Sequence, residues 1–240
     1  MYKRQSHIIQ KPVAVILGNF GNIGCLAARA FACQGTAVAM MHEAGERSSR
    51  VVDCLSGDNH FAMSGCLSRS SDLASFAGLV HTLYGRVDYL INCEDAAVAV
   101  RGLHCSARAR LSVLLEHAFV SGAVIVNMVS CSGRKMKRRW KEDVSRMEDG
   151  LARRDVRMNQ VVIHRPVFQR FSNVRLASSA CAAALFLCGS EGRHIDREYI
   201  VVNERRAVRR PGVRPETSLS FLKSYLEFCS VCSRTVFLDA

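Results

Sequence analysis

Apolar residues in the first two hundred positions fall into short runs that alternate with longer, mixed stretches. The short runs are rich in Val, Ile and Ala, as buried parallel strands are, whereas the longer stretches repeat apolar residues at helical spacing. This alternation predicts βαβ units, and therefore an α/β fold in which helices cover both faces of a doubly wound, mostly parallel, seven-stranded sheet. The predicted strands are 12–17, 36–41, 60–64, 87–92, 123–129, 156–163 and 199–203, and the predicted helices are 23–34, 71–84, 106–121, 139–154 and 175–188.

The composition changes after residue 203. Residues 204–215 are rich in arginine and contain two prolines, and the pattern of residues 218–228 predicts one short helix. We therefore expect one α/β domain over residues 1–203, followed by a basic linker and a short C-terminal helix over residues 204–240. A chain of 240 residues with 49% hydrophobic and 22% charged residues is long enough for one such core with an appendage.

No stretch of the sequence approaches the roughly 18 to 20 apolar residues that a membrane span needs. Residues 1–7 are too polar to form the core of a secretory signal. The sequence therefore predicts no membrane association and an intracellular, reducing compartment, either the cytoplasm or an organelle such as the mitochondrion. The eleven cysteines are expected to stay reduced there, and the single Cys-x-x-Cys at 229–232 has no second pair at zinc-binding spacing, so no metal site is predicted.

A glycine-rich turn separates the first predicted strand from the first predicted helix. Its sequence, Gly18-Asn-Phe-Gly21-Asn-Ile-Gly24, has glycines where the chain must turn tightly, let a pyrophosphate approach the backbone and open a helix. The amides at the N-terminus of such a helix favour an anion. The cofactor-binding candidates in this turn are Gly18, Asn19, Gly21, Asn22, Ile23 and Gly24.

Four further segments occur in the order seen in one large enzyme family. They are Tyr-Gly-Arg-Val-Asp-Tyr-Leu-Ile-Asn at 84–92, Gly-Ala-Val-Ile-Val-Asn-Met-Val-Ser at 122–130, Val-Arg-Met-Asn-Gln at 156–160, and the run at 184–190 followed by the strand at 199–203. Together with the glycine turn, they resemble the short-chain dehydrogenase/reductase family from about residue 12 to residue 203. The resemblance implies a Rossmann-like fold and an oxidoreductase that uses NAD(H) or NADP(H).

The same resemblance implies roles for individual residues. The three glycines of the turn would line the pyrophosphate, Asn92 would stand first in the family's Asn-Asn-Ala-Gly segment, and Ser130 would orient the substrate carbonyl. Counting back from Asn159 at the family's spacing places Lys137 near the lysine that holds the nicotinamide ribose. Ser130 and Lys137 are therefore the catalytic candidates.

The sequence departs from the family where the chemistry resides. Cys-Glu-Asp at 93–95 replaces the segment's Asn-Ala-Gly, and the acidic residue that reads adenine falls at or near Cys66. The proton-donating tyrosine is absent from its place, which Gly133 occupies, and no tyrosine lies between Tyr89 and Tyr199. These departures predict that the family's usual acid–base chemistry is lost.

Two substitutes for the missing tyrosine are weighed. His164 follows the sixth predicted strand, where an imidazole would transfer protons near neutral pH, although a histidine in a loop more often satisfies a hydrogen bond. Glu94 and Asp95 form a carboxylate pair, although adjacent carboxylates more often cap or solvate a loop. Neither substitute is favoured.

Residues after the second predicted strand bear on the choice of nucleotide. Glu43 would suit the ribose hydroxyls of NAD, whereas Arg47 with Ser48 would suit the 2′-phosphate of NADP. The sequence does not decide between NAD and NADP, and it slightly favours NADP.

The formal charge of +12 comes mainly from 27 arginines beside 6 lysines. Arginine forks suit phosphates, so this excess fits acidic partners such as RNA, bound through its backbone, and it equally fits a solvated basic surface without such a partner. The nucleic-acid candidates are Arg134, Lys135, Lys137, Arg138 and Arg139. Two functions follow: a catalytically lapsed relative of the family that serves as a structural or RNA-contacting subunit of a homo-oligomer or larger assembly, or an active NAD(P)-dependent oxidoreductase that reduces a carbonyl with a non-standard proton donor.

Overall fold

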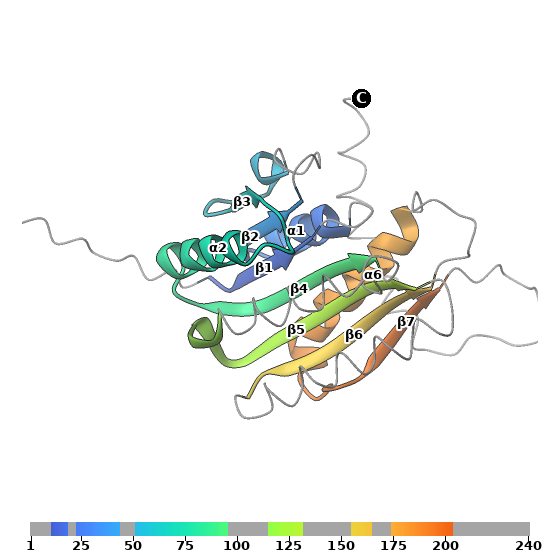
Figure 1. The fold of residues 1–240 in the computed structure, drawn as a ribbon. Helices are drawn as coiled ribbons and strands as arrows, with labels where there is room; N and C mark the ends of the chain where they lie inside the picture. Colours follow the sequence, from blue (N-terminus) through green and yellow to red (C-terminus); the bar gives the residue numbers. More distant parts are fainter. Residues whose placement is uncertain are drawn as a thin grey trace, which may run out of the picture.

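The computed structural model describes residues 11–18, 23–43, 51–95, 115–131, 155–164 and 174–203. Seven parallel strands form one sheet in the order β3-β2-β1-β4-β5-β6-β7 (Figure 1). The strands are β1 (Val13–Leu17), β2 (Ala37–His42), β3 (Phe61–Ser64), β4 (Val87–Asp95), β5 (Phe119–Cys131), β6 (Arg157–His164) and β7 (Tyr199–Asn203). The sequence-based fold class, a doubly wound α/β sheet of seven strands, is confirmed.

Three α-helices lie in the described part of the chain. They are α1 (Ile23–Cys33), α2 (Ser70–Leu83) and α6 (Val174–Cys188), accompanied by the short 3₁₀ helices η3 (Val52–Cys54), η4 (Glu116–Ala118) and η5 (Ser190–Gly192). In Figure 1, α1 and α6 lie behind the sheet and α2 lies in front of it. No described helix has both the length and the apolar character that crossing a membrane requires.

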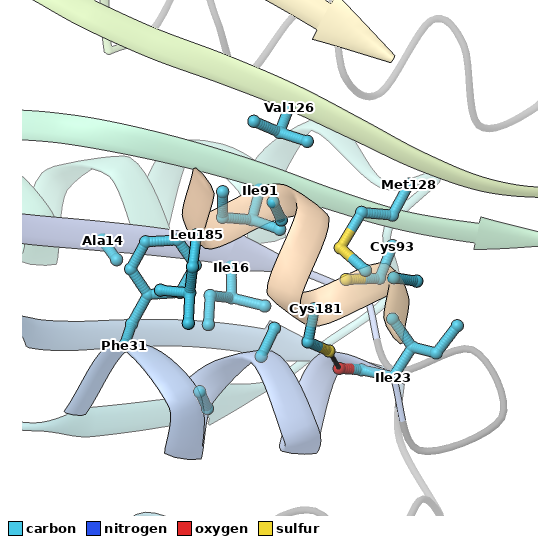
Figure 2. Packing of buried hydrophobic residues seen from close by; sticks show 14 of the residues in the cluster. Ala14, Ile16, Ile23, Phe31, Ile91, Cys93, Val126, Met128, Cys181 and Leu185 are labelled. Atoms are coloured by element: carbon cyan, nitrogen blue, oxygen red, sulfur yellow. Dashed lines mark hydrogen bonds between the residues drawn. The ribbon is translucent and has the colours of Figure 1, made fainter. Parts of the chain in front are cut away.

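Strands β1 and β2 are apolar except for His42, because helices cover both faces of this part of the sheet. Every residue of β1 and β2 is buried. On one face, side chains such as Ile16 and Ile91 pack against Phe31 of α1 and Leu185 of α6 (Figure 2). On the other face, Leu90 and neighbouring side chains pack against α2. Burial of two such layers is the main force that holds the strand ends in place.

One predicted helix is wrong at its end. The sequence pattern extended a helix over residues 106–121, but η4 ends at Ala118 and β5 begins at Phe119. Gly122 adopts a φ of +76°, and its N–H donates to the carbonyl of Asp155. Phe119 pairs in register with Val87 of β4, so the strand begins three residues before this left-handed glycine and pairing with the sheet wins over the helical pattern. Residues 106–114, the predicted helix 139–154 and the segment 204–240 lie outside the described residues.

Candidate functional site

The strand order changes direction at the carboxyl ends of β1 and β4. From β1 the chain crosses to β2 on one side, and β4 later pairs with β1 on the other side. In open parallel sheets, ligands bind outside the strand ends at this change of direction. The residues that follow or end these strands are therefore the candidate site.

Gly18 turns the chain directly after β1. Its φ is +85°, and its N–H donates to the carbonyl of Met41, 2.8 Å away. A Cβ at this position would lie 2.5 Å from the carbonyl oxygen of Cys93 on β4. Real side chains do not approach a backbone oxygen so closely, so only glycine lets the turn pass against β4. Glycine is therefore required here by the contact between the turn and β4, and a role of this turn toward a pyrophosphate stays a prediction.

The start of α1 belongs to the core. Ile23 is fully buried, and the Cys181 thiol of α6 lies 3.9 Å from its carbonyl oxygen, as the dashed line in Figure 2 shows. Gly24 is buried in the same turn of helix. A role for these two residues toward a nucleotide stays a prediction. Asn19, Gly21 and Asn22 lie outside the described residues.

Glu43, the candidate ribose acceptor, contacts the protein's own backbone. Its Oε1 accepts a hydrogen bond of 3.0 Å from the N–H of Leu67, in the turn after β3. The neighbouring main-chain bond from Gly65 to the carbonyl of His42 holds the same turn against β2. A ribose hydroxyl would compete with the Leu67 amide for this carboxylate oxygen. Arg47, the alternative residue for NADP, lies outside the described residues.

A second carboxylate at this turn was not among the sequence-based candidates. Asp72 Oδ2 accepts a hydrogen bond of 2.9 Å from the N–H of Cys66, which is the main reason why the pKa of Asp72 is lowered. The Cys66 thiol lies 3.0 Å from the hydroxyl of Ser68. An acidic residue in the first turn of a predicted helix was the signal that would have identified Asp72. The backbone amides of Cys66 and Leu67 therefore both donate to carboxylates of this chain, Asp72 and Glu43.

The Glu43 contact leads to a local prediction. In Glu43→Ala, hydrogen exchange at the Leu67 amide is expected to accelerate by about tenfold, because the amide loses a charge-assisted hydrogen bond. Glu43→Gln keeps an acceptor and is expected to retain most of the protection. The Gly65 amide, which donates to a main-chain carbonyl, is the internal control in residue-resolved exchange. Unchanged Leu67 exchange in the alanine variant would contradict the contact.

Asn92 is a buried part of the sheet. It is 1% exposed, and its Nδ2 donates a hydrogen bond of 2.6 Å to Oδ1 of Asn127 on β5. Gln160 of β6 is the next residue in the same register row. Asn127 and Gln160 were missed by sequence reasoning, although an amide within an apolar strand was a signal for both. Asn92, which the family resemblance places first in the Asn-Asn-Ala-Gly segment, therefore links β4 to β5 through a side-chain hydrogen bond.

Ser130, the catalytic candidate, is the second-last residue of β5. It is 1% exposed, and within the described part of the chain its Oγ has no hydrogen-bond partner. Asp95 and Ile163 are its register neighbours, so the β4 segment of Glu94 and Asp95 does reach this edge.

His164 is exposed at the end of β6. It pairs in register with Cys131 and Asn203, one residue beyond the row of Ser130. Successive residues of a strand alternate between faces, so His164 and Ser130 lie on opposite faces of the sheet. Both residues lie at the carboxyl-terminal edge of the sheet, but their side chains are not next to each other. Lys137 and the five basic candidates at 134–139 lie outside the described residues.

The described tyrosines belong to the packing of the protein. The Tyr84 hydroxyl donates to the carbonyl of Asn59 over 2.7 Å, and burial raises the pKa of Tyr84 to about 12. Tyr89 packs against Phe31 with ring centroids 5.5 Å apart. Tyr199 begins β7 and pairs with Gln160. None of these three phenols stands beside Ser130, and Tyr2 and Tyr225 lie outside the described residues. Within the described ranges, no group of three or more His, Cys, Asp or Glu residues could hold a metal ion.

The order of the parallel strands defines an α/β protein of the Rossmann type, and comparison with solved structures identifies which proteins have a similar fold. The chain is similar to a hydroxysteroid dehydrogenase of Escherichia coli, with a TM-score of 0.65 and 20% identity over 80% of this chain and 95% of that one. It is also similar to a short-chain dehydrogenase/reductase of Serratia marcescens (TM-score 0.64, 15% identity, 82% and 98% of the two chains) and to one of Brucella melitensis (0.65, 16%, 80% and 94%).

These likenesses show that the chain has the fold of the short-chain dehydrogenases/reductases. No model of a known protein family matches the sequence, and no curated protein matches it.

Proposed function

We propose that the chain is a divergent member of the short-chain dehydrogenase/reductase family that has lost the family's chemistry and serves as a structural or RNA-contacting subunit of a larger assembly. One observation carries the proposal: a hydride-transfer site of the resembled kind needs a phenol beside Ser130, and the sequence contains no tyrosine between Tyr89 and Tyr199. Tyr84 and Tyr89, which precede this interval, are committed to packing.

The described residues fit a nucleotide only in part. The sequence has the glycine that the resembled turn requires at position 18, but Glu43 bonds to the Leu67 amide and Asn92 bonds to Asn127. If NADP or NAD is bound, the glycine turn would hold its pyrophosphate, and the nicotinamide would accept or donate hydride. The contacts of Glu43 and Asn92 support a protein in which these groups maintain the fold.

The test is a titration with NADPH and NADH followed by cofactor fluorescence, together with a screen of carbonyl substrates. We expect no NAD(P)H-dependent turnover in the wild type. Turnover that Ser130→Ala abolishes would overturn the proposal. It would favour the alternative, an active NAD(P)-dependent oxidoreductase with a non-standard proton donor. That alternative is supported by the Ser130 hydroxyl, for which the described residues supply no hydrogen-bond partner. If the protein binds the cofactor at micromolar concentration without turnover, the proposal stands, with the cofactor as a structural ligand of a lapsed enzyme.

The RNA-contacting role is supported by the +12 charge and by the basic run at 134–139. Replacing its five basic residues with Gln is expected to flatten the dependence of RNA affinity on salt, by about 0.7 in log–log slope for each phosphate of single-stranded RNA that is no longer neutralised. The matched control replaces the exposed Arg193 and Arg197 of the loop before β7, and the slope should stay that of the wild type. A slope unchanged in the five-residue variant would remove this run from the proposal.

The partners and the compartment follow from the same proposal. A subunit without its own chemistry acts by contact, so we propose a homo-oligomer or a larger protein assembly that carries RNA. A reducing compartment, the cytoplasm or an organelle, suits the many cysteines. Size-exclusion chromatography with light scattering, run with and without ribonuclease treatment, measures whether the assembly forms and whether RNA holds it together.

A further inference from the structure

Three buried amides form a row across the centre of the sheet. Asn92 of β4 pairs in register with Asn127 of β5, and Asn127 pairs with Gln160 of β6. Their exposed fractions are 1%, 0% and 0%. Register partners share a face of a sheet. This is the face of α2, because the residues two positions away, such as Leu90 and Ile125, belong to the core that packs against α2.

The row makes far fewer hydrogen bonds than its amides can make. Asn92 Nδ2 donates to Asn127 Oδ1, and this is the only amide-to-amide bond of the row. In the described structure no partner is found for Asn92 Oδ1, Asn127 Nδ2, or either polar atom of Gln160. Turning an amide by 180° exchanges its oxygen and nitrogen. Turning Gln160, or both asparagines together, leaves the same shortage, and turning one asparagine alone breaks the Asn92–Asn127 bond, so no assignment of the amides removes the shortage.

Such a shortage is costly inside an apolar layer. A buried donor or acceptor that has left water without finding a new partner loses the free energy of its hydration. Native proteins satisfy nearly all such groups, and where protein atoms do not suffice they use buried water, which makes about three hydrogen bonds to otherwise unsatisfied groups. The shortage therefore points to a bound partner.

The chemistry of the row selects the class of that partner. Free oxygens and free NH₂ groups lie on neighbouring strands, so a cation would meet the amide nitrogens and an anion would meet the oxygens. The partner must be neutral and must both donate and accept hydrogen bonds. Complete burial of all three side chains excludes a large organic molecule. Water meets each of these requirements.

We propose that the amide row is an internal hydration site, with at least one water molecule held between Asn127 and Gln160. This water accepts from Asn127 Nδ2 and donates to or accepts from the amide of Gln160. The hydrated row ties β4, β5 and β6 in register. A slip of any one of these strands by one residue would turn its amide into the opposite core, so the row keeps the strand ends at Ser130 and His164 aligned. The site does not rest on the proposed function.

The experiment counts long-lived internal waters by ¹⁷O magnetic relaxation dispersion. Gln160→Met keeps the length of the side chain and removes both polar atoms, so the dispersion amplitude should fall by at least one water molecule relative to the wild type. Met158→Leu, an apolar exchange on the same strand and core face, is the matched control and should leave the amplitude unchanged. An equal amplitude in the wild type and Gln160→Met would overturn the proposal.

Two further measurements keep the proposal falsifiable. A hydrated row loses a hydrogen-bonded partner in Gln160→Met, so the urea midpoint of unfolding should fall, whereas a dry row would be relieved of two unpaired atoms and the midpoint would rise. If Gln160→Met does not fold, a measurement on the wild-type protein alone still tests the proposal. Cross-relaxation between water and the side-chain NH₂ of Gln160 is expected, and its absence in the folded protein would contradict the site.

Discussion

Replacing Gly18 with alanine is expected to lower the free energy of unfolding by about 3 kcal/mol. Two costs add up: a left-handed backbone costs a residue with a Cβ about 1–2 kcal/mol, and forcing an extra carbon into a packed site costs about 1–3 kcal/mol. Both apply here, because Gly18 has a φ of +85° and its Cβ would lie 2.5 Å from the Cys93 carbonyl oxygen. Urea unfolding followed by circular dichroism measures the loss.

Gly35 is the matched control for this substitution. Its φ of +77° is close to that of Gly18, but no heavy atom lies within 4 Å of the added Cβ. Gly35→Ala is therefore expected to bear only the backbone cost, about 1–2 kcal/mol. The difference between the two variants measures the contact with β4, and equal losses would show that this contact does not constrain Gly18.

The comparison also bears on what the glycine turn says about function. Gly18 is required by the packing of β1 against β4 whether or not a nucleotide is bound. A glycine at this position is therefore weaker evidence for cofactor binding than its place in the motif suggests. The titration with NADPH and NADH decides that question, and the stability of Gly18→Ala does not.

Asp88→Ala is expected to lower the free energy of unfolding by a similar amount, about 3 kcal/mol. The carboxylate is 12% exposed. It accepts 2.8 Å from the N–H of Val13, at the start of β1, and 3.0 Å from Nε of Arg86, and the resulting ion pair raises the pKa of Arg86. Removing one partner of a buried pair leaves the other charge uncompensated, which typically costs about 3–5 kcal/mol. Because Arg86 is partly exposed, we expect a loss of stability at the lower end of this range. Denaturant unfolding at low and high salt measures it.

Asp58→Ala is the control for the Asp88 variant. Asp58 also forms an ion pair, with Lys11 at 2.9 Å, but both side chains are more than half exposed. Exposed pairs contribute little because water screens them, so the urea midpoint should not change measurably. If Asp58→Ala lowers the free energy of unfolding as much as Asp88→Ala does, the stabilising effect of an ion pair in this part of the protein does not depend on its burial.

Sequence pattern predicts the strands better than it predicts the site. Uniformly apolar runs such as 13–17 and 37–41 have no stable place except inside a covered parallel sheet, and they lie there in the structure. The helix end predicted at residue 121 was wrong because the pairing of Phe119 with Val87 of β4 is a tertiary feature. Helical spacing in the preceding segment carries no trace of this pairing.

The functions of polar residues depended on partners far along the chain. Glu43 follows β2, where a ribose-binding acid is expected, but its position in sequence does not reveal that the Leu67 amide, 24 residues later, takes one carboxylate oxygen. Asn92 likewise meets Asn127, 35 residues away. Such pairs arise only when strands adopt a common register, because a shift of one residue would send the two side chains to opposite faces.

The sequence by itself determined the α/β class, the seven strands, the need for glycine at the turn after β1 and the absence of a tyrosine between Tyr89 and Tyr199. These properties depend on local composition, hydrophobic period and residue identity, which are written in the chain. Only the tertiary structure decided that Gly18 packs against Cys93, that Glu43 holds Leu67, that Ser130 and His164 lie on opposite faces, and that three amides share one buried row. Each of these depends on strand order and register, which long-range burial selects and no short window of sequence encodes.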